Sequence, residues 1–242
     1  MGWGDEIIAS GQARRAQLTD PRRVQILDRY GAARWDPIWE GNPRIARPGE
    51  QGDFQRIINA PKVRPYIAAK TDERWTWRDF DCPPGEIFLT EAERAFARQR
   101  RPQIIVEPTL KARASPNKHW GAERWQEFAR LAKKAGYGLT QLGPSGTRPL
   151  QHATMICTPD FRSACAVLAN AKAYVGHEGG MHHAAAALGI PAVVIFGGFI
   201  SPAQTGYKTH RNLFTGGEPC GMRVPCKHCA DAMAAITPQI IF

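Results

Sequence analysis

Strand-like and helix-like hydrophobic patterns alternate along the second half of the chain. Short apolar runs typical of buried strands lie at residues 102–108, 137–143, 172–177 and 191–198. Helical patterns lie between them at residues 122–136, 161–171 and 179–189. Strands that alternate with helices indicate a parallel sheet covered on both faces, so the sequence predicts a doubly wound, Rossmann-like α/β domain over residues 102–242.

The helix predicted at 122–136 has one apolar face and ends at Gly136. The apolar face consists of Trp125, Phe128, Ala129 and Ala132. A shorter helix is predicted before the first strand of this half, because Thr90 and Glu93 have the spacing of a capping box.

The first 101 residues have a less regular pattern. It predicts a helix at 4–18, strands at 22–28, 55–60 and 64–69, and a loop rich in Pro, Gly and Trp at 34–54. We therefore expect a reduced α/β domain over residues 1–101, packed across a cleft from residues 102–242.

The composition is that of an ordinary globular protein. Of 242 residues, 43% are hydrophobic and 22% are charged. No apolar run approaches the roughly 20 residues that span a bilayer, and the N-terminus lacks the layout of an export signal. We expect a cytoplasmic protein without a transmembrane segment, whose six cysteines meet a reducing environment.

Positive charge is concentrated in the second half of the chain. Residues 1–101 hold 18 Lys/Arg and 15 Asp/Glu, whereas residues 102–242 hold 14 and 7, which gives net charges of +3 and +7. This excess fits a polyanionic ligand, such as a nucleoside diphosphate or a phosphate backbone. It fits a solvated basic surface equally well, and charge alone leaves both interpretations open.

Gly179 and Gly180 lie where a predicted strand is followed by a helix. Glycines let a ligand approach the backbone, and the free amides at a helix N-terminus attract an anion. A phosphate-bearing ligand explains these glycines, and so does a tight turn without a ligand. His182 and His183 point about 100° apart on a helix, so only one of them can readily face the same site.

Residues 178–197, EGGMHHAAAALGIPAVVIFG, carry the first of three motifs that resemble glycosyltransferase family 9, the heptosyltransferase-like family. That family has the pattern D-[ST]-G-x-x-H, then A-A-L-G-x-P and a strand ending in F-G. The match aligns Glu178 with the acidic position, Gly180 with the glycine and His183 with the histidine. The departure is a glutamate where the family usually has an aspartate.

Two further motifs support the resemblance. Residues 115–136, which begin SPNKHWGAERW, are similar to the family's K-x-W-P-x-E-x-[FW] segment. This similarity aligns Lys118 with the phosphate-binding lysine and includes Ser115 among the donor-binding residues. Gly4-Asp5 resembles the family's N-terminal glycine-aspartate, whose aspartate is regarded as the catalytic base.

The resemblance implies two Rossmann-like domains of the GT-B type, the first of them shortened here. It further implies inverting, metal-independent transfer of a heptose-like sugar from a nucleoside-diphosphate donor, with no cofactor. The acceptor is expected to be a hydroxyl of lipopolysaccharide or another glycan or lipid-linked acceptor, and an enzyme of this kind works in the cytoplasm or peripherally at the inner membrane face.

In this scheme the catalytic base is Asp5, and the donor diphosphate lies between Lys118 and the amides of Gly179 and Gly180. His183 can hydrogen-bond a phosphate, and Glu178 binds a sugar hydroxyl or orders its loop. An alternative role for Asp5 is to cap a helix that begins at Glu6.

Two other functions remain open. A group of tryptophans and arginines can stack on bases and bind phosphates, which suggests a nucleic-acid-binding protein or a transferase acting on nucleic acid, although simple packing explains the tryptophans equally well. The residues are Trp35, Trp39, Trp75, Trp77, Arg34, Arg44, Arg47, Arg74 and Arg78. A nucleotide-sugar hydrolase or epimerase on the same scaffold is the other alternative.

A cysteine-rich segment, CGMRVPCKHC, lies near the C-terminus. Cys226 and Cys229 have the spacing of zinc ligands, with Cys220 and His228 nearby. Because His228 immediately precedes Cys229, joint ligation is expected to be awkward. We therefore expect free thiols in a loop, with a structural metal as the alternative.

Overall fold

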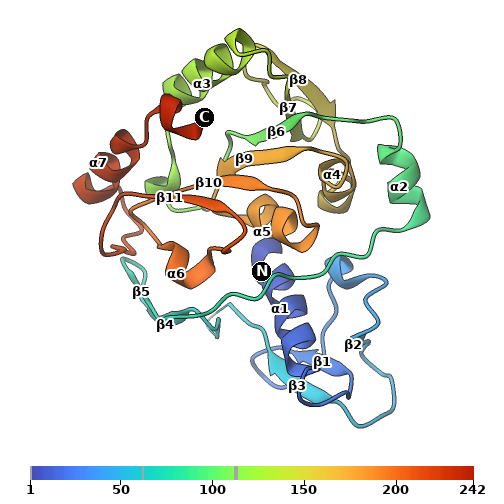
Figure 1. Ribbon diagram of the computed structural model, residues 1–242. Helices are drawn as coiled ribbons and strands as arrows, with labels where there is room; N and C mark the ends of the chain where they lie inside the picture. Colours follow the sequence, from blue (N-terminus) through green and yellow to red (C-terminus); the bar gives the residue numbers. More distant parts are fainter. Residues whose placement is uncertain (1, 62, 112–113) are drawn as a thin grey trace.

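The computed structural model describes residues 2–61, 63–111 and 114–242, and its centre is a six-stranded parallel sheet (Figure 1). The strand order is β11-β10-β9-β6-β7-β8. The strands are β6 (Ile104–Glu107), β7 (Leu139–Gly143), β8 (Ala153–Cys157), β9 (Ala173–His177), β10 (Ala192–Gly197) and β11 (Arg211–Phe214). The predicted fold class, an α/β protein with a doubly wound parallel sheet, is confirmed. Residues 112 and 113, between the predicted strand at 102–108 and the predicted helix at 122–136, lie outside the described residues.

Helices follow most of the strands. The α-helices of this part are α2 (Glu91–Ala97), α3 (Ala122–Lys134), α4 (Phe161–Leu168), α5 (Gly180–Ala187), α6 (Pro202–Thr205) and α7 (Lys227–Ala235). Two 3-10 turns are η2 (Pro116–Lys118) and η3 (Pro238–Ile241). The predicted capping box of Thr90 and Glu93 forms at α2, and the four residues predicted for the apolar face of α3 are its buried residues.

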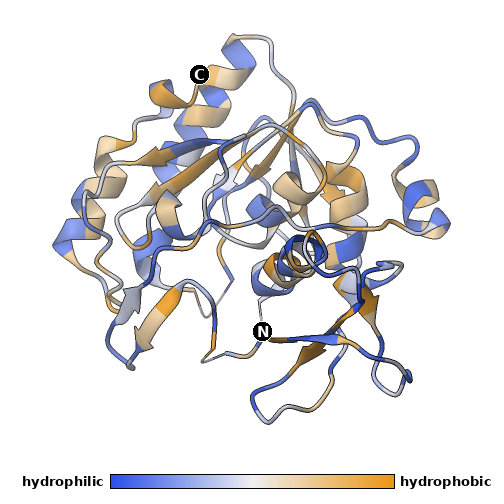
Figure 2. Ribbon diagram, turned by 60° about the horizontal axis from the view of Figure 1, so that its bottom comes forward, coloured by the Kyte–Doolittle hydropathy of each residue, from blue (hydrophilic) through white to orange (hydrophobic). Residues whose placement is uncertain are grey.

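The sheet separates two apolar cores because side chains alternate between its faces. Ile105 and Tyr174 pack with α4 and α5, whereas their chain neighbours Val106 and Val175 pack with α3. Figure 2 shows that hydrophobic residues are concentrated in the strands of this sheet. None of the helices in the described part of the chain is long and apolar enough to cross a membrane.

The N-terminal part forms a second, smaller α/β unit. Its elements are α1 (Trp3–Ala16), β1 (Val24–Leu27), η1 (Pro37–Trp39), β2 (Ile45–Ala46), β3 (Gln55–Ile58), β4 (Ile67–Lys70) and β5 (Trp75–Trp77). Strands β2-β1-β3 form a parallel sheet, and β4 and β5 form an antiparallel pair. The domain boundary at residues 101 and 102 stays a prediction.

Helix α1 lies between the small sheet and α5 (Figure 1). A β-carbon on Gly4 would lie 2.5 Å from Cδ2 of His183, so glycine is needed for this close approach. The helix is unusual because it buries the polar residues Asp5, Glu6 and Ser10. Buried polar groups at a helix contact require specific partners, and these partners define the site described next.

Candidate active site

Side chains from both halves of the chain meet where β9 ends and α5 begins. The strand order reverses here. From β6 the sheet continues through β7 and β8 on one side and through β9, β10 and β11 on the other. In open α/β sheets, ligands bind outside the carboxyl ends of the strands at such a point.

Glu178 is the centre of this cluster and is only 6% exposed. Its Oε2 forms an ion pair with Nζ of Lys118, and its Oε1 lies 3.6 Å from Nε2 of His183. Burial by itself would raise the pKa of Glu178, but Lys118 and His183 outweigh burial and hold that pKa well below its usual value. The site therefore keeps a negative carboxylate beside a cation.

His183 is held in place from its other side. Its Nδ1 lies 2.7 Å from the hydroxyl of Tyr207, a residue that the sequence did not single out. His182 behaves differently, as expected for two adjacent helical residues. It is fully buried, and neither of its ring nitrogens has a hydrogen-bond partner among the described residues. Its ring instead packs against the rings of Phe196, Tyr207 and His210.

Asp5 lies in the first turn of α1 and is 8% exposed. Its Oδ1 accepts a 2.5 Å hydrogen bond from the hydroxyl of Tyr66, and its Oδ2 is 2.9 Å from the guanidinium of Arg64. The helix begins at Trp3 and not at Glu6, and Asp5 is its third residue, whose Oδ2 accepts a 3.4 Å hydrogen bond from the amide of Gly2. The carboxylate thus combines a capping contact with two long-range partners.

Arg64 and Tyr66 connect Asp5 with the Glu178 cluster. Burial raises the pKa of Tyr66, and the negative charges of Asp5 and Glu178 raise it further. The same two carboxylates help raise the pKa of Arg64 against the effect of its burial. Asp5 and Glu178 therefore belong to one electrostatic environment. The packing of Gly4 against His183 fixes the two sides of this environment relative to each other.

The turn that carries Lys118 is anchored on residues 222–226. Ser115 caps the turn and donates a 3.1 Å hydrogen bond to the carbonyl of Met222. Asn117 donates to the carbonyls of Met222 and Val224, both at 2.7 Å. Ser115, predicted as a donor-binding residue, thus has its hydroxyl engaged in positioning Lys118.

The two glycines at the start of α5 have different surroundings. A β-carbon on Gly179 would meet only the carbonyl oxygen of His177, at 3.9 Å. A β-carbon on Gly180 would lie within 3.3 to 3.4 Å of Trp3 and Phe161, whose rings stack. Gly179 therefore leaves room for a ligand near the helix N-terminus, whereas Gly180 makes room for packing.

The tryptophans do not form one exposed aromatic surface. Trp39 is fully buried, and its ring contact is with Trp35. Trp75 and Trp77 contact each other and Phe199. These contacts agree with the packing interpretation.

Several of the arginines predicted for phosphate binding have partners within the chain. Arg34, Arg44 and Arg47 form ion pairs with Glu6, Glu86 and Glu40 respectively. Arg74 donates a hydrogen bond to the carbonyl of Cys220. These four arginines thus have partners within the chain, and the nucleic-acid alternative stays a prediction.

The cysteine-rich segment folds into a cluster. The ligand atoms of Cys220, Cys226, His228 and Cys229 all lie within 4.8 Å of one another, although His228 and Cys229 are adjacent. The adjacency is compatible with joint ligation because Cys229 is the third residue of α7 and its side chain turns back toward Cys220. The segment is thus a compact cluster, not a set of separate loop thiols.

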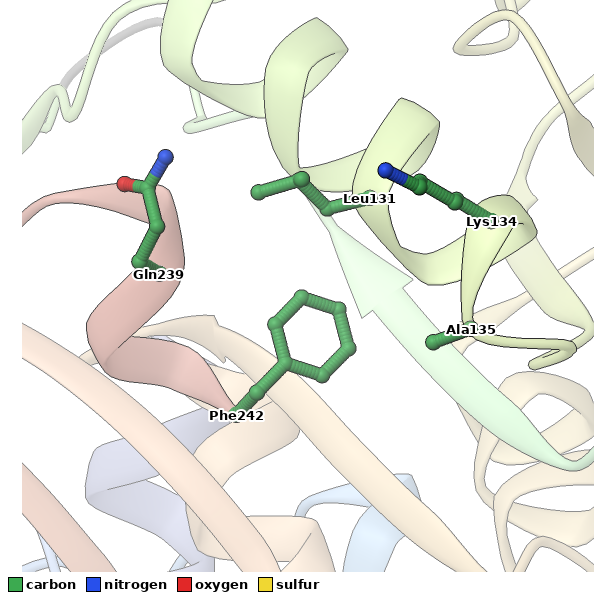
Figure 3. A pocket seen from close by; sticks show the side chains of 5 residues that line it. All are labelled: Leu131, Lys134, Ala135, Gln239 and Phe242. Atoms are coloured by element: carbon green, nitrogen blue, oxygen red, sulfur yellow. The ribbon is translucent and has the colours of Figure 1, made fainter.

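A pocket of about 450 Å³ lies elsewhere, between α3 and the C-terminal turn η3 (Figure 3). It is lined by Leu131, Lys134, Ala135, Gln239 and Phe242. It shares no residue with the cluster around Glu178, and a single charged side chain lines it. This pocket is therefore separate from the cluster at the end of β9.

The sequence model of the family "Glycosyltransferase family 9 (heptosyltransferase)" matches residues 79–227, more than half of the chain. The chain belongs to glycosyltransferase family 9. The matched range contains Lys118, Glu178 and His183, whereas Asp5 lies outside it. No curated protein sequence matches the chain.

Two solved structures with TM-scores above 0.5 share the fold at low sequence identity. The alignment with the iron-containing dodecameric glycosyltransferase TibC of enterotoxigenic E. coli H10407 covers 100% of this chain and 74% of TibC, at 16% identity and a TM-score of 0.66. A family 9 glycosyltransferase of Veillonella parvula DSM 2008 aligns with 88% and 82% respectively, at 16% identity and a TM-score of 0.61. The chain spans only 50% of E. coli ADP-heptose lps heptosyltransferase II, with 64% of its own residues, 21% identity and a TM-score of 0.47.

Proposed function

We propose that this family 9 chain transfers a sugar from a nucleoside-diphosphate donor to an acceptor hydroxyl, with inversion at the anomeric carbon. The observation that carries the proposal is the convergence of Lys118, Glu178 and His183 beside the open N-terminus of α5, with Asp5 facing the same environment. The family's description as heptosyltransferase supports a heptose-like sugar.

The donor diphosphate would bind between Lys118 and the amide groups near Gly179. The departing nucleoside diphosphate gains negative charge, and fixed positive groups stabilise that charge in the transition state. Lys118 and the helix N-terminus supply such groups without a metal ion at the reacting centre. Because Lys118 is paired with Glu178, the diphosphate would either share Lys118 with this carboxylate or displace the carboxylate from it. A displaced Glu178 would be free to bind a sugar hydroxyl.

Asp5 would act as the base that takes the proton of the acceptor hydroxyl. A general base must be a carboxylate within hydrogen-bond reach of that hydroxyl. The guanidinium of Arg64 lies 2.9 Å from Oδ2 of Asp5 and the hydroxyl of Tyr66 donates to Oδ1, so these two contacts fix the orientation of the carboxylate. A glycan or lipid-linked acceptor is proposed, with the enzyme in the cytoplasm or at the inner membrane face.

A product analysis tests the proposal. The protein is incubated with a panel of nucleoside-diphosphate sugars, alone and with glycan, lipopolysaccharide-core or oligonucleotide acceptors, and nucleoside-diphosphate release is measured. We expect release that depends on a glycan acceptor, and a product whose anomeric configuration, read by NMR, is opposite to that of the donor. Equal release without any acceptor would instead indicate a hydrolase, and a response to oligonucleotides alone would support the nucleic-acid alternative.

A further inference from the structure

A second chemically active cluster lies outside the proposed reaction centre. It consists of Cys220, Cys226, His228 and Cys229. Sγ of Cys220 lies 3.7 Å from Sγ of Cys226 and 3.1 Å from Sγ of Cys229. Nδ1 of His228 lies 3.8 Å from Sγ of Cys229.

These distances resemble the edges of a small tetrahedron. A tetrahedral zinc ion with bonds of about 2.3 Å to sulfur separates its sulfur ligands by about 3.8 Å. A disulfide needs a sulfur–sulfur distance of about 2.0 Å, which no pair of these thiols has. The arrangement is therefore that of a metal-ligand set and not of a cystine.

The imidazole of His228 is oriented as a metal ligand. Its Nε2 lies 2.6 Å from the carbonyl oxygen of Gly216, so Nε2 can donate a hydrogen bond while Nδ1 faces the thiols. Metal-bound histidines commonly donate their second ring N–H to a backbone carbonyl. A β-carbon on Gly198 would lie 2.8 Å from Cε1 of His228, so the backbone also leaves space for this ring.

We propose that Cys220, Cys226, His228 and Cys229 bind one tetrahedral metal ion of the thiolate-preferring class, Zn²⁺ or iron. Three thiolates and one imidazole form a closed four-ligand set, which is typical of structural metal sites. With no open position and no contact with Glu178 or Asp5, the ion has a structural role and takes no part in sugar transfer.

The loop that the ion would fix connects three parts of the fold. The amides of Cys220 and Gly221 donate to the carbonyls of Gly198 and Phe199, beyond the end of β10. The carbonyl of Gly221 also accepts a 2.9 Å hydrogen bond from the amide of Trp75 in β5. Metal binding would therefore hold the β4–β5 pair against the large sheet.

The same loop supports the turn that carries Lys118. Asn117 bonds the carbonyls of Met222 and Val224, and its side-chain oxygen accepts from the amide of Cys226, itself one of the proposed ligands. The metal site thus acts as a positioning device for Lys118. This second step rests on the proposed function, whereas the metal site itself does not.

Metal content tests the site directly. The full chain, purified without an affinity tag and with reductant, is analysed by mass spectrometry of its metals. We expect about one zinc or iron per chain, and the element found distinguishes the two ions. Cys226→Ser and Cys229→Ser should lose the metal, whereas Cys157→Ser, an exposed cysteine outside the cluster, should retain it.

Two measurements on the wild-type chain keep the test independent of whether the variants fold. After chelation, Co²⁺ should restore binding and give the absorption bands of tetrahedral cobalt thiolate. Thiol titration in denaturant should find all six cysteines. A chain without bound metal, equal metal content in Cys229→Ser, or two missing thiols from a disulfide would each overturn the proposal.

Hydrogen exchange tests the positioning role. Removal of the metal should increase exchange in residues 114–118 and 73–77 at least several-fold, and Zn²⁺ should reverse the increase. The control is residues 125–132 of α3, which should not change. Unchanged exchange at 114–118 after metal removal would overturn the positioning role.

Discussion

Replacing Lys118 with methionine tests the ion pair at the centre of the proposed site. Methionine keeps much of the side-chain volume but removes the charge, so it leaves Glu178 buried without its cation. Breaking a buried ion pair by removing one partner costs about 3–5 kcal/mol. The Lys118 side chain is still 19% exposed, and His183 remains 3.6 Å from Glu178, so we expect a smaller loss of about 2 kcal/mol in unfolding free energy.

The effect should depend on pH in a defined direction. The pKa of Glu178 is lowered in the folded protein from its ordinary value of 4.5. The pair therefore stabilises the fold fully above about pH 4.5, and this stabilisation is lost as the pH falls through the lowered folded-state pKa. The difference between the wild type and Lys118→Met should accordingly shrink on acidification.

Urea unfolding of Lys118→Met, Glu178→Gln, the double variant and the control Lys134→Met measures this coupling. Lys134 is an exposed lysine at the end of α3, and its variant should match the wild type. The double variant should lose about 1 kcal/mol less unfolding free energy than the sum of the losses in the two single variants. A Lys118→Met protein within about 0.5 kcal/mol of the wild type, or strict additivity, would refute the reasoning.

Three further substitutions test other parts of the account. Asp5→Asn should lower turnover about a hundredfold with little change in donor affinity, as steady-state kinetics and calorimetry can show; a sharp fall in Tm with normal turnover would make Asp5 only a cap. Gly4→Ala should lower the unfolding free energy by about 1–3 kcal/mol, because its β-carbon would lie 2.5 Å from the His183 ring; an unchanged Tm would contradict this packing. Burial raises the pKa of Glu107 to about 7, so the wild type should lose stability as the pH rises from about 4.5 through 7. Glu107→Gln, which can still accept from Tyr174, should lose less stability over that range, and identical Tm profiles would refute the assignment.

The sequence predicts the centre of the fold better than its edges. Strands β6, β9 and β10 lie in the middle of the sheet and are mostly apolar, as expected for strands buried on both faces. The two strands at the ends of the sheet order, β8 and β11, are partly exposed and mix polar with apolar residues, so the hydrophobic pattern did not predict them. The sequence pattern did not predict helix α7, because cysteine and histidine interrupt its apolar residues.

The sequence pointed to part of the candidate site. Local motifs identified Asp5, Lys118, Glu178 and His183, which the fold brings into one environment. The residues that orient them, Arg64, Tyr66 and Tyr207, act through contacts with residues distant in the sequence. No local pattern marks such residues, so the sequence does not predict their roles. The structure shows them, because the fold places Arg64 and Tyr66 against Asp5, and Tyr207 against His183.

Binding of nucleoside-diphosphate sugars tests the central claim most directly. Isothermal titration is carried out on the wild type, Lys118→Met, Gly179→Ala and the control Lys134→Met. Gly179 has an extended φ of 169° and open space around its position for a β-carbon, so alanine should fold normally while its methyl group intrudes on the ligand. The account predicts that one donor binds the wild type and the control equally, and both site variants about tenfold or more weakly. Undiminished affinity in both site variants, or no binding of any nucleoside-diphosphate sugar, would contradict it.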